Sequence, residues 1–469
     1  MKRKFWSLLL LTALTAGMIS GCGSDSDKAK TGDNSVDNSS TPIPTNAVAG
    51  DPYAKDSFVI WGWNDEIKKI LDGPFKEDYP EDYKRIVFVD TSDSNSYQTK
   101  LDDILSDTQN NLYPDIIGLE VDYVLKYVKG KDLLPVDELG IKADDYKYQY
   151  SYNLDLGTDD DGVLKALFWQ ATPGNWQLRA DLCEQYLGTT DPKKLQSKFS
   201  SWDKILETAK QINDASKGRV KILSGYSDLF RVFCNARKDG WYDSKDKEES
   251  QPIQIDDQMK QYMDVAKEMY ENEYTFCTDQ WSADWNENMI GNGKTTNAAL
   301  AYTGCPWFTY RNLGGDGEEN PNPWVENTIL VQGPQKFYWG GTGLAATKNC
   351  SDTELAGKIM KYFTCDTESM IKINELNGDY LNNKKVIKKI KNTATCDKLY
   401  PDAKQNIMQF YLPLAEGIDA STVTAEDQSI NEEWDRQVKE YVQGKKDEEE
   451  AIKDFKAAVH NRYAYLTIE

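Results

Sequence analysis

The stretch FVIWGWND, residues 58–65, decides the fold, because an apolar run of strand length passes directly into tryptophan, amide and carboxylate side chains. Two further runs, 85–90 and 115–120, have the same character. Near-continuous apolar segments of this length are typical of strands that are buried on both faces of a parallel sheet. We therefore predict strands over 57–63, 85–90 and 115–120.

Helical patterns separate these strands, at 66–71 and 97–107. The order β-α-β-α-β implies right-handed crossovers and an open, largely parallel sheet, so the fold class is α/β. Two later stretches carry amphipathic stripes at helical spacing, one over 202–212 after a Ser201 cap and one over 259–270. Such stripes predict helices that bury one face in a core.

The first 21 residues have the organisation of a signal peptide. Basic residues at 2–4 precede an apolar stretch at 5–16 that is too short to span a bilayer, and Ile-Ser-Gly-Cys follows at 19–22. That tetrad resembles the lipobox of bacterial lipoproteins, in which the cysteine is diacylated and becomes the first residue of the mature chain. We expect residues 1–21 to be removed and the lipid on Cys22 to anchor the protein to the extracytoplasmic face of the cell membrane.

Residues 22–50 are predicted to form a flexible stalk, because they are almost all Ser, Asp, Asn, Thr, Lys, Gly and Pro and contain no aromatic residue. The remaining body is too long for one compact core, so we expect two lobes. The chain of 469 residues has a formal net charge of −22. This charge excludes nucleic acid as a partner and favours neutral or cationic ligands.

The cysteine and histidine content argues against metal, redox and triad chemistry. Seven cysteines follow Cys22, and none stands in C-x-x-C spacing: Cys183, Cys234, Cys277, Cys305, Cys350, Cys365 and Cys396. We interpret them as isolated buried thiols rather than a disulfide framework. The single histidine, His460, is predicted to be a surface or packing residue. We expect no catalytic residue, no metal and no cofactor.

The ends of the predicted strands carry aromatic, amide and carboxylate residues that are candidates for ligand recognition. Ligands in open α/β sheets bind at the carboxyl ends of strands, where this chain places 61–65 and 120–123. A sugar stacks its C–H faces on aromatic rings while carboxylates, amides and arginines bind its hydroxyl groups. Side chains alternate along a strand, so Trp61 and Trp63, which lie two residues apart, point to the same face. Each is therefore either a core residue or a ligand platform.

Several motifs together resemble the bacterial carbohydrate ABC-transporter solute-binding lipoproteins. In chain order they are FVIWGWND (58–65), SYQTKLD (96–102), YPDIIGLEVDYV (113–124), LLPVDELG (133–140), WQATPG (169–174), SWDK (201–204), GCPWF (304–308) and WGGTG (339–343). The resemblance covers nearly the whole body. Each motif is weakly specific, and their order along the chain is the stronger signal. Cys305 departs from the small or aromatic residue that is usual there.

The resemblance implies a two-lobed periplasmic-binding-protein fold of type II, like that of maltose-binding protein. Each lobe would be a mixed, mainly parallel sheet flanked by helices, with the ligand in the cleft between the lobes. Lobe one would take residues 51–166 and 335–378, and lobe two would take 167–334 and 379–469. The chain would cross between the lobes more than once.

The resemblance also implies which residues bind the ligand. They are Trp63, Asn64, Asp65, Tyr97, Gln98, Glu120, Asp122, Trp176, Arg179, Arg231, Trp281, Trp285, Trp307, Trp339, Gly340 and Gly341. Arg179 and Arg231 are alternatively surface ion-pair partners. Trp281 and Trp285 are alternatively core residues.

The expected function is capture of a sugar, preferably an oligosaccharide, by lobe closure and its delivery to the permease subunits of an ABC importer. We expect a monomer that carries out no chemistry. Two other classes remain open from the residues alone. One is an anchored glycoside hydrolase, with Glu120 and Asp122 as its acid and base. The other is a binding protein for peptides or polyamines, which the acidic charge would suit.

Overall fold

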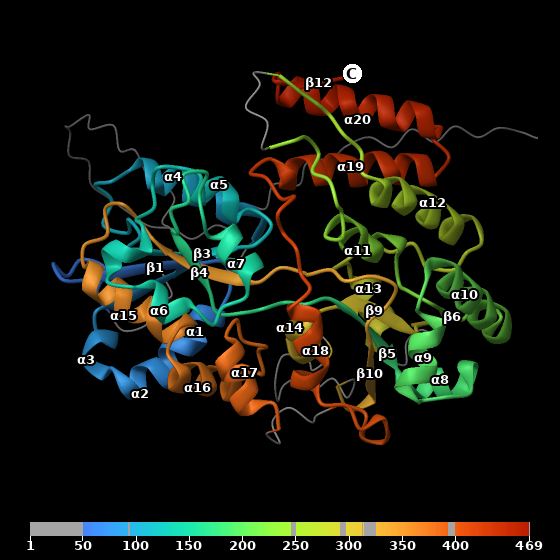
Figure 1. Cartoon of the computed structure of the whole chain (residues 1–469), viewed down its shortest axis with the longest axis horizontal. Coiled ribbons are helices and arrows are strands. Elements are labelled where there is room, and N and C mark those ends of the chain that lie inside the picture. Colours follow the sequence, from blue (N-terminus) through green and yellow to red (C-terminus); the bar gives the residue numbers. More distant parts are fainter. Residues whose placement is uncertain are drawn as a thin grey trace, which may run out of the picture. The chain divides into compact units, whose positions relative to one another are not determined.

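The computed structural model describes residues 50–91, 94–244, 250–290, 297–311, 313, 325–392 and 399–468. The predicted signal peptide, Cys22 and nearly all of the predicted stalk lie outside these residues. The described chain forms two sheets with separate helices, which Figure 1 draws on the left and right of the view.

The first sheet has five strands and contains the three strands predicted from the sequence. Its strand order is β2 (Ile86–Asp90), β1 (Phe58–Gly62), β3 (Ile116–Glu120), β11 (Thr342–Ala346) and β4 (Ala166–Phe168). β1 pairs in parallel with both β2 and β3, whereas β11 pairs antiparallel with β3 and β4. Every residue of β1 and β2 is buried, as the continuous apolar runs predict.

Helices from two parts of the chain pack around this sheet (Figure 1). From the N-terminal part come α1 (Glu66–Ile70), α2 (Lys76–Asp78), α3 (Pro80–Tyr83), α4 (Ser94–Ser106), α5 (Val124–Val128), α6 (Ala143–Tyr146) and α7 (Ser151–Leu156). From later in the chain come α15 (Thr353–Thr364), α16 (Thr367–Asn377) and α17 (Lys384–Ile390). α1 and α4 confirm the predicted helices between the strands.

The second sheet has three strands, in the order β10 (Thr328–Val331), β5 (Asn175–Arg179) and β9 (Ala301–Gly304). Both pairings are antiparallel, and the parallel pairs in this region of the described chain are two short ones outside the sheet, β6 (Val220–Lys221) with β8 (Ala298–Ala299) and β12 (Leu466–Thr467) with β7 (Gln251–Pro252). The expectation of a mainly parallel sheet in each lobe is therefore correct for half of the first sheet and wrong for the second. β5 and β10 lie at the two inter-sheet connections, which run in opposite directions, so these strands meet antiparallel.

The second sheet is covered by a separate set of helices: α8 (Ala180–Leu187), α9 (Pro192–Lys198), α10 (Trp202–Ser216), α11 (Phe230–Cys234), α12 (Asp257–Glu271), α13 (Ala283–Ile290) and α14 (Pro306–Arg311). α10 and α12 confirm the two amphipathic predictions. Ser201 caps α10 by accepting a hydrogen bond from the Lys204 backbone N–H at 3.3 Å.

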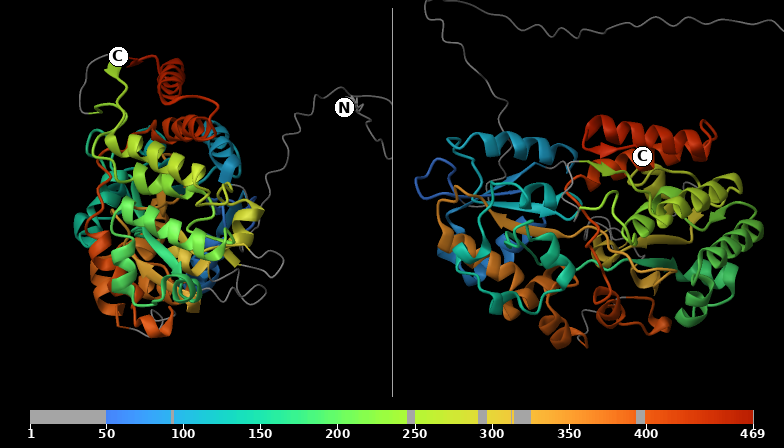
Figure 2. Two further views of the ribbon diagram at one scale, coloured as in Figure 1. Left: turned by 90° about the vertical axis from the view of Figure 1, so that its right-hand side faces the viewer. Right: turned by 45° about the horizontal axis from the view of Figure 1, so that its top comes forward.

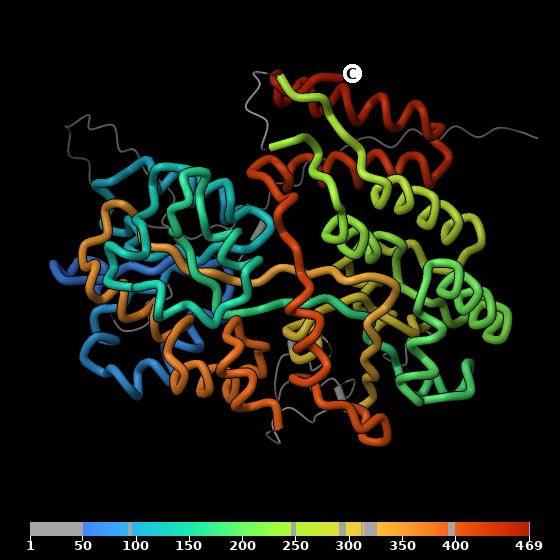
Figure 3. Tube along the Cα trace, viewed as in Figure 1, coloured from blue at the N-terminus to red at the C-terminus, as the bar shows by residue number. Residues whose placement is uncertain are grey.

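Two segments connect the sheets and run side by side, as Figure 3 shows in the centre of the view. Residues 169–174 lead from β4 to β5, and residues 332–341 lead from β10 back to β11. They are paired by hydrogen bonds from Gly174 N to Phe337 O at 2.7 Å and from Trp339 N to Thr172 O at 3.0 Å. A β-carbon on Gly174 would approach the Phe337 ring to 2.2 Å, so this close pairing requires glycine.

A third connection, residues 416–426, joins α18 (Ile407–Ala415) to α19 (Asp427–Val442). α19 packs against α12 and against α20 (Glu448–Arg462), and Figure 2 shows the two C-terminal helices above the second group of helices. A short strand, β12 (Leu466–Thr467), then pairs with β7 (Gln251–Pro252). The C-terminal part of the chain therefore returns to the second sheet.

The hydrophobic packing divides the predicted C-terminal part of lobe two. Tyr380 to Ala420 contribute to the core around the first sheet, and Ile430 to Leu466 contribute to the core around the second. The sequence placed all of 379–469 with lobe two. The physical reason for the difference is that α17 and α18 bury their apolar faces beside α16 and Tyr380, before the third connection crosses.

The structure describes six cysteines, all free thiols, in agreement with the absence of a framework spacing: Cys183, Cys234, Cys277, Cys305, Cys350 and Cys365. The predicted burial is correct for Cys183, Cys234 and Cys305 and wrong for Cys277, which is exposed. Cys396 lies outside the described residues. Within the described ranges, no helix combines the length and apolar character needed to cross a membrane.

Candidate functional site

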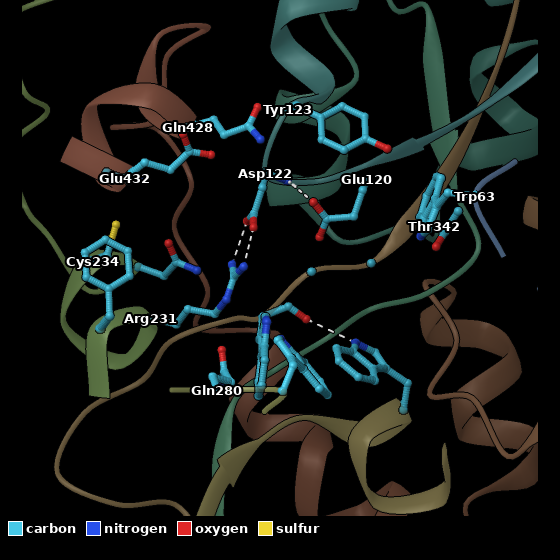
Figure 4. Close-up of a pocket in the computed structure, with 18 of the residues that line it drawn as sticks. Trp63, Glu120, Asp122, Tyr123, Arg231, Cys234, Gln280, Thr342, Gln428 and Glu432 are labelled. Atoms are coloured by element: carbon cyan, nitrogen blue, oxygen red, sulfur yellow. Dashed lines mark hydrogen bonds and ion pairs between the residues drawn. The ribbon is translucent and has the colours of Figure 1, made fainter. Parts of the chain in front are cut away.

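A cleft of about 700 Å³ lies at the carboxyl ends of β1 and β3 (Figure 4). Residues associated with the first sheet and residues associated with the second both line it, and the connection at 339–342 forms its floor. This position follows from the parallel arrangement of β1 and β3, whose last residues meet at one edge of the sheet.

Two carboxylates enter the cleft from the end of β3. Glu120 is the last residue of that strand, and one of its carboxylate oxygens accepts a hydrogen bond from the Asp122 backbone N–H at 2.8 Å. Burial raises the pKa of Glu120 to about 8, and the negative charge of Asp122 acts in the same direction, while Arg231 opposes both. Glu120 therefore changes protonation state near neutral pH.

Asp122 and Arg231 join the two sides of the cleft. The Arg231 guanidinium on α11 donates to the two Asp122 carboxylate oxygens at 2.7 and 2.5 Å, a bidentate geometry (Figure 4). Each side chain keeps somewhat under a third of its surface exposed. The alternative interpretation of Arg231 as an ion-pair residue is thus correct, but the pair lies inside the cleft rather than on the outer surface.

Tryptophan rings form one wall of the cleft. Trp307 on α14 lies beside Trp339, with ring centroids 5.3 Å apart, and the Trp307 indole N–H donates to the Trp339 carbonyl oxygen at 3.2 Å. Trp281 lies nearly parallel to Trp307, at 6.5 Å and an interplanar angle of 20°. The Trp281 side chain is 49% exposed and its φ is +68°, in the left-handed region. Strained residues of this kind are concentrated at functional sites.

Trp63 lies apart from this wall, directly after β1 (Figure 4). Its ring packs on Tyr97 at 5.3 Å and on Tyr123 at 6.2 Å, which fixes its orientation. Trp61, two residues earlier, is fully buried and donates its indole N–H to the Leu112 carbonyl oxygen at 2.8 Å. The two residues that the sequence left undecided therefore divide into one core residue and one cleft residue.

Amide side chains complete the floor and the rim. Gln170 donates to the buried Asp379 carboxylate at 3.1 Å and accepts from the Thr342 backbone N–H at 2.9 Å, so both ends of its amide are fixed. Across the cleft, the Gln98 side chain on α4 donates to the Gln428 side chain on α19 at 3.0 Å. This further contact between the two sides is therefore uncharged and only partly buried.

Most of the ligand residues that the sequence predicts line the cleft. They are Trp63, Asn64, Gln98, Glu120, Asp122, Arg231, Trp281, Trp307, Trp339, Gly340 and Gly341. Their assignment to ligand binding stays a prediction, because the cleft shows only that these side chains share one space.

The structure places five predicted residues elsewhere. Tyr97 is buried and donates its hydroxyl to the Gly118 carbonyl oxygen at 2.8 Å. Trp176 is fully buried, and Trp285 is also buried and donates its indole N–H to Asp228 at 2.8 Å. Arg179 forms an ion pair with Asp181, and Asp65 forms one with Lys69. In each case local pairing or core packing takes a side chain that the motif alone assigns to the ligand.

Other cleft residues were missed by the sequence analysis. They include Glu66, Tyr123, Gln170, Thr342, Phe230, Asn235, Asp279, Gln280, Gln428, Asn431, Glu432 and Asp435. Gln170 and Thr342 lie within motifs already singled out, so those motifs were a usable signal. The residues of α19 had no local signal, because only the third connection brings that helix to the cleft.

The described residues hold no group of three or more His, Cys, Asp or Glu side chains that is arranged to bind a metal ion. The cleft thus combines aromatic rings, fixed amides, carboxylates and one guanidinium. This set of groups can bind a polar, uncharged or cationic molecule by stacking and hydrogen bonding.

An α/β chain that connects two sheets by a paired ribbon and a third segment, with a polar and aromatic cleft at the strand ends, has the organisation of a type II periplasmic binding protein. Solved structures support this class. A protein described as extracellular solute-binding protein family 1 matches 85% of this chain and 97% of its own, at 15% identity and a TM-score of 0.69.

Two further structures match with similar coverage. An ABC-transporter-associated binding protein from B. animalis subsp. lactis Bl-04, in complex with beta-1,6-galactobiose, matches 88% of this chain and 99% of its own, at 14% identity and a TM-score of 0.67. The GacH receptor of Streptomyces glaucescens, solved unliganded and with acarbose, matches 88% and 99% at 14% identity and a TM-score of 0.66. The chain therefore has the fold of the extracellular solute-binding proteins, and the predicted fold class is confirmed.

No family model matches the sequence, and no curated protein matches it either.

Proposed function

We propose that this protein is the extracytoplasmic solute-binding component of an ABC importer and that it captures a saccharide in the cleft. The fold is one that binds ligands between two lobes. The observation that carries the proposal is the composition of the cleft, in which Trp281, Trp307 and Trp339 form an aromatic wall opposite the Glu120 carboxylate. Stacking surfaces facing hydrogen-bonding groups suit the two kinds of surface that a sugar presents.

The size of the cleft supports an oligosaccharide. A volume of about 700 Å³ exceeds that of a single sugar ring, and the tryptophans lie at more than one position along it. Proteins of similar fold are described with galactobiose, lacto-N-biose and maltose. We therefore extend saccharide binding, and a preference for two or more rings, to this chain as a proposal.

Binding is proposed to close the two lobes on the ligand without any chemical step. The sheet connections at 169–174 and 332–341 are the natural hinge, because few other described segments join the two sheets. Gly340 and Gly341 have φ values of +62° and +119°, so the backbone next to the cleft adopts conformations that favour glycine. The closed form would then be recognised by permease subunits in the membrane.

The lobe assignment that we propose keeps 51–166 and 335–378 in lobe one and 167–334 in lobe two. Packing of the hydrophobic cores supports moving 379–420 to lobe one and keeping only the remainder of the C-terminal part in lobe two.

Anchoring by a lipid on Cys22 is part of the same proposal. It rests on the lipobox and on the polar composition of residues 22–50, both of which lie outside the described structure except for Gly50. A tether of that length would keep the body near a membrane permease.

The experiment that tests the function is a thermal-shift screen of the purified protein against a panel of mono- and oligosaccharides, followed by calorimetric titration of the hits. A ligand at 100 times its dissociation constant stabilises the folded state by about 2.7 kcal/mol. Stabilisation by disaccharides or longer sugars, with the sugar recovered intact, is the expected result. Release of shortened sugar would instead favour a hydrolase, and the absence of any saccharide hit would contradict the proposal.

A further inference from the structure

The cleft is strongly acidic for a sugar site. Six carboxylate residues line it, whereas Arg231 is the only lysine or arginine among the lining residues. The carboxylates are Glu66, Glu120, Asp122, Asp279, Glu432 and Asp435. Glu66 lies on α1, and Glu120 and Asp122 lie at the end of β3. Glu432 and Asp435 lie on α19, and Asp279 lies in the segment before α13.

Ion pairs compensate only part of this charge. Asp122 is paired with Arg231, and Asp279 is paired with Lys439 at 2.6 Å. Glu120, Glu432 and Asp435 form no ion pair with a lysine or arginine of the described chain.

Hydrogen bonding leaves these carboxyl groups available to a ligand. Glu120 accepts from one backbone N–H, and Asp435 accepts from the Tyr262 hydroxyl at 2.9 Å. Burial raises the pKa of both Glu120 and Asp435, the former to about 8. Arg231 lowers the pKa of Glu120 and Lys439 lowers that of Asp435, but burial is the larger influence on each, so a further cation would stabilise both charged forms.

The cleft already holds one cation, and its surroundings show how a second can bind. The Arg231 guanidinium lies 5.5 Å from the centroid of the Trp339 ring while it is paired with Asp122. A carboxylate on one side and a tryptophan face on the other is a favourable environment for a cation. Asp122 and Arg231 together carry no net charge, so Arg231 does not offset the negative charge of the other carboxylates in the cleft.

The surroundings of Glu120 next to Gly340 differ from those of Arg231. A β-carbon built on Gly340 would be 2.9 Å from one oxygen of the Glu120 carboxylate and 3.7 Å from Cζ2 of Trp307. Cζ2 and Nε1 are the Trp307 atoms nearest this point, so the edge of that ring, rather than its face, lies beside Glu120 above the backbone of the connection. The oxygen of Glu120 on this side is not the one that accepts from the Asp122 N–H.

We propose that the ligand is a basic saccharide, an oligosaccharide of amino sugars with free, protonated amines, and that Glu120 binds one ammonium group. This inference rests on the proposed function, since it names the class of sugar for the same cleft. Glu432 and Asp435 provide negative charge on the opposite rim for a second amine on another ring. Trp281 and Trp63 remain available to stack on the uncharged ring faces.

Protonation of Glu120 gives the proposal a measurable signature. The charged groups that act on it are Asp122, Arg231 and Glu66, and no lysine lines the cleft beside it. An ammonium group bound there stabilises the ionised carboxylate, so binding near neutral pH releases a proton from Glu120. A neutral sugar does not favour the ionised form in this way.

The test compares matched ligands of equal length by calorimetric titration at pH 6.5. The three probes are β-1,4-linked glucosamine oligomers, their N-acetylated counterparts, and the corresponding glucose oligomers. We expect the free-amine oligomer to bind at least tenfold more tightly than both neutral probes. Its affinity should fall with added salt, and titrations in buffers of different ionisation enthalpy should reveal proton release.

Variants localise the effect. Glu120→Gln, which keeps the shape of the side chain, is expected to weaken binding of the free-amine oligomer at least tenfold and to abolish proton release. The matched control is Glu449→Gln, which makes the same change in net charge at an exposed position on α20 and should leave binding unchanged. A Glu120→Gln variant that binds the free-amine oligomer as tightly as the wild type would overturn the assignment of Glu120.

The outcomes separate this inference from the proposed function. If a neutral oligomer binds as tightly as the free-amine oligomer or more tightly, the inference is wrong and the saccharide-binding function stands. If spermidine binds and no saccharide does, both are wrong, and the protein is a polyamine-binding protein. Tighter binding of the free-amine oligomer, with spermidine weaker, supports both.

Discussion

We predict opposite effects on stability and ligand affinity for substitutions of Trp281 and Trp285, although the two residues lie only four positions apart. Trp285 is fully buried beside Tyr302 and donates its indole N–H to the buried Asp228 carboxylate. Trp285→Ala should therefore lower the free energy of unfolding by about 3–5 kcal/mol, the range for a buried tryptophan. Trp281 is 49% exposed, so burial of about half its surface gives Trp281→Ala a cost of about 2 kcal/mol or less.

Ligand affinity should show the reverse order. If Trp281 stacks on a sugar ring, Trp281→Ala removes that contact and weakens binding by about 1–2 kcal/mol, roughly five- to thirtyfold. Trp285→Phe keeps an aromatic ring in the core and should leave the affinity of the folded protein unchanged. It should still lower stability, by about 1–3 kcal/mol, because Asp228 loses a hydrogen-bond donor in a buried position.

The backbone at Trp281 supplies an internal control. Its φ of +68° is unfavourable for any residue with a β-carbon, so Trp281→Gly should be about 1 kcal/mol more stable than Trp281→Ala while binding equally weakly. Guanidinium denaturation gives the stabilities, and calorimetric titration with the best saccharide gives the affinities. Weaker binding by Trp285→Phe with unchanged stability would refute the assignment of Trp285 to the core and Trp281 to the ligand.

Three further predictions concern the acidic groups, the inter-lobe ion pair and the anchor. The pKa of Glu120 is about 8 in the folded protein, against an ordinary value of 4.5, so the stability of the protein falls as pH rises between these two values. Glu120→Gln removes this loss, so its gain in melting temperature over the wild type should grow from pH 5 to pH 8. Asp122→Asn removes the charge that pairs with Arg231, and small-angle scattering of the ligand-free variant should show a larger radius of gyration than the wild type, whereas an equal radius would count against the pair as a contact that holds the cleft together. Cys22→Ala should release the protein from the membrane fraction, and unchanged membrane partitioning with the wild-type mass would contradict lipidation.

The first sheet was predictable because its strands carry an unambiguous signal. Continuous apolar runs at β1, β2 and β3 alternate with helical patterns, an order that is typical of parallel strands covered on both faces, and these three strands are parallel. The cleft residues at the ends of β1 and β3 followed from the same sheet, since strand ends are where such folds bind ligands. Trp63, Glu120 and Asp122 were found in this way.

Residues outside that sheet could not be assigned from local patterns. Trp281 and Trp285 have the spacing of one helical face, but α13 begins at Ala283, so Trp281 precedes the helix. Its ring lies 5.1 Å from that of Trp285 and is half exposed, whereas Trp285 is fully buried. Arg179 and Arg231 differ in this respect: Asp181 lies only two residues from Arg179 in the sequence, whereas only the fold places Asp122 beside Arg231.

The C-terminal part was unpredictable for a similar reason. Amphipathic stripes show that α17, α18 and α19 are buried on one face, but they carry no information on which core each helix joins. The third connection determines which core each of these helices joins, and it also brings the acidic residues of α19 to the cleft.

The most direct test of the account is calorimetric titration of the purified protein with the best saccharide from the panel, run in parallel on a Trp307→Ala/Glu120→Gln double variant. These two residues occupy facing positions in the cleft and lie outside the sheet connections that would act as the hinge. The account predicts one saccharide bound per wild-type protein, recovered intact, and binding weakened at least a hundredfold in the double variant while its folded structure is kept. Saccharide binding of wild-type strength in the double variant would contradict the account, because the sugar would then be bound outside this cleft.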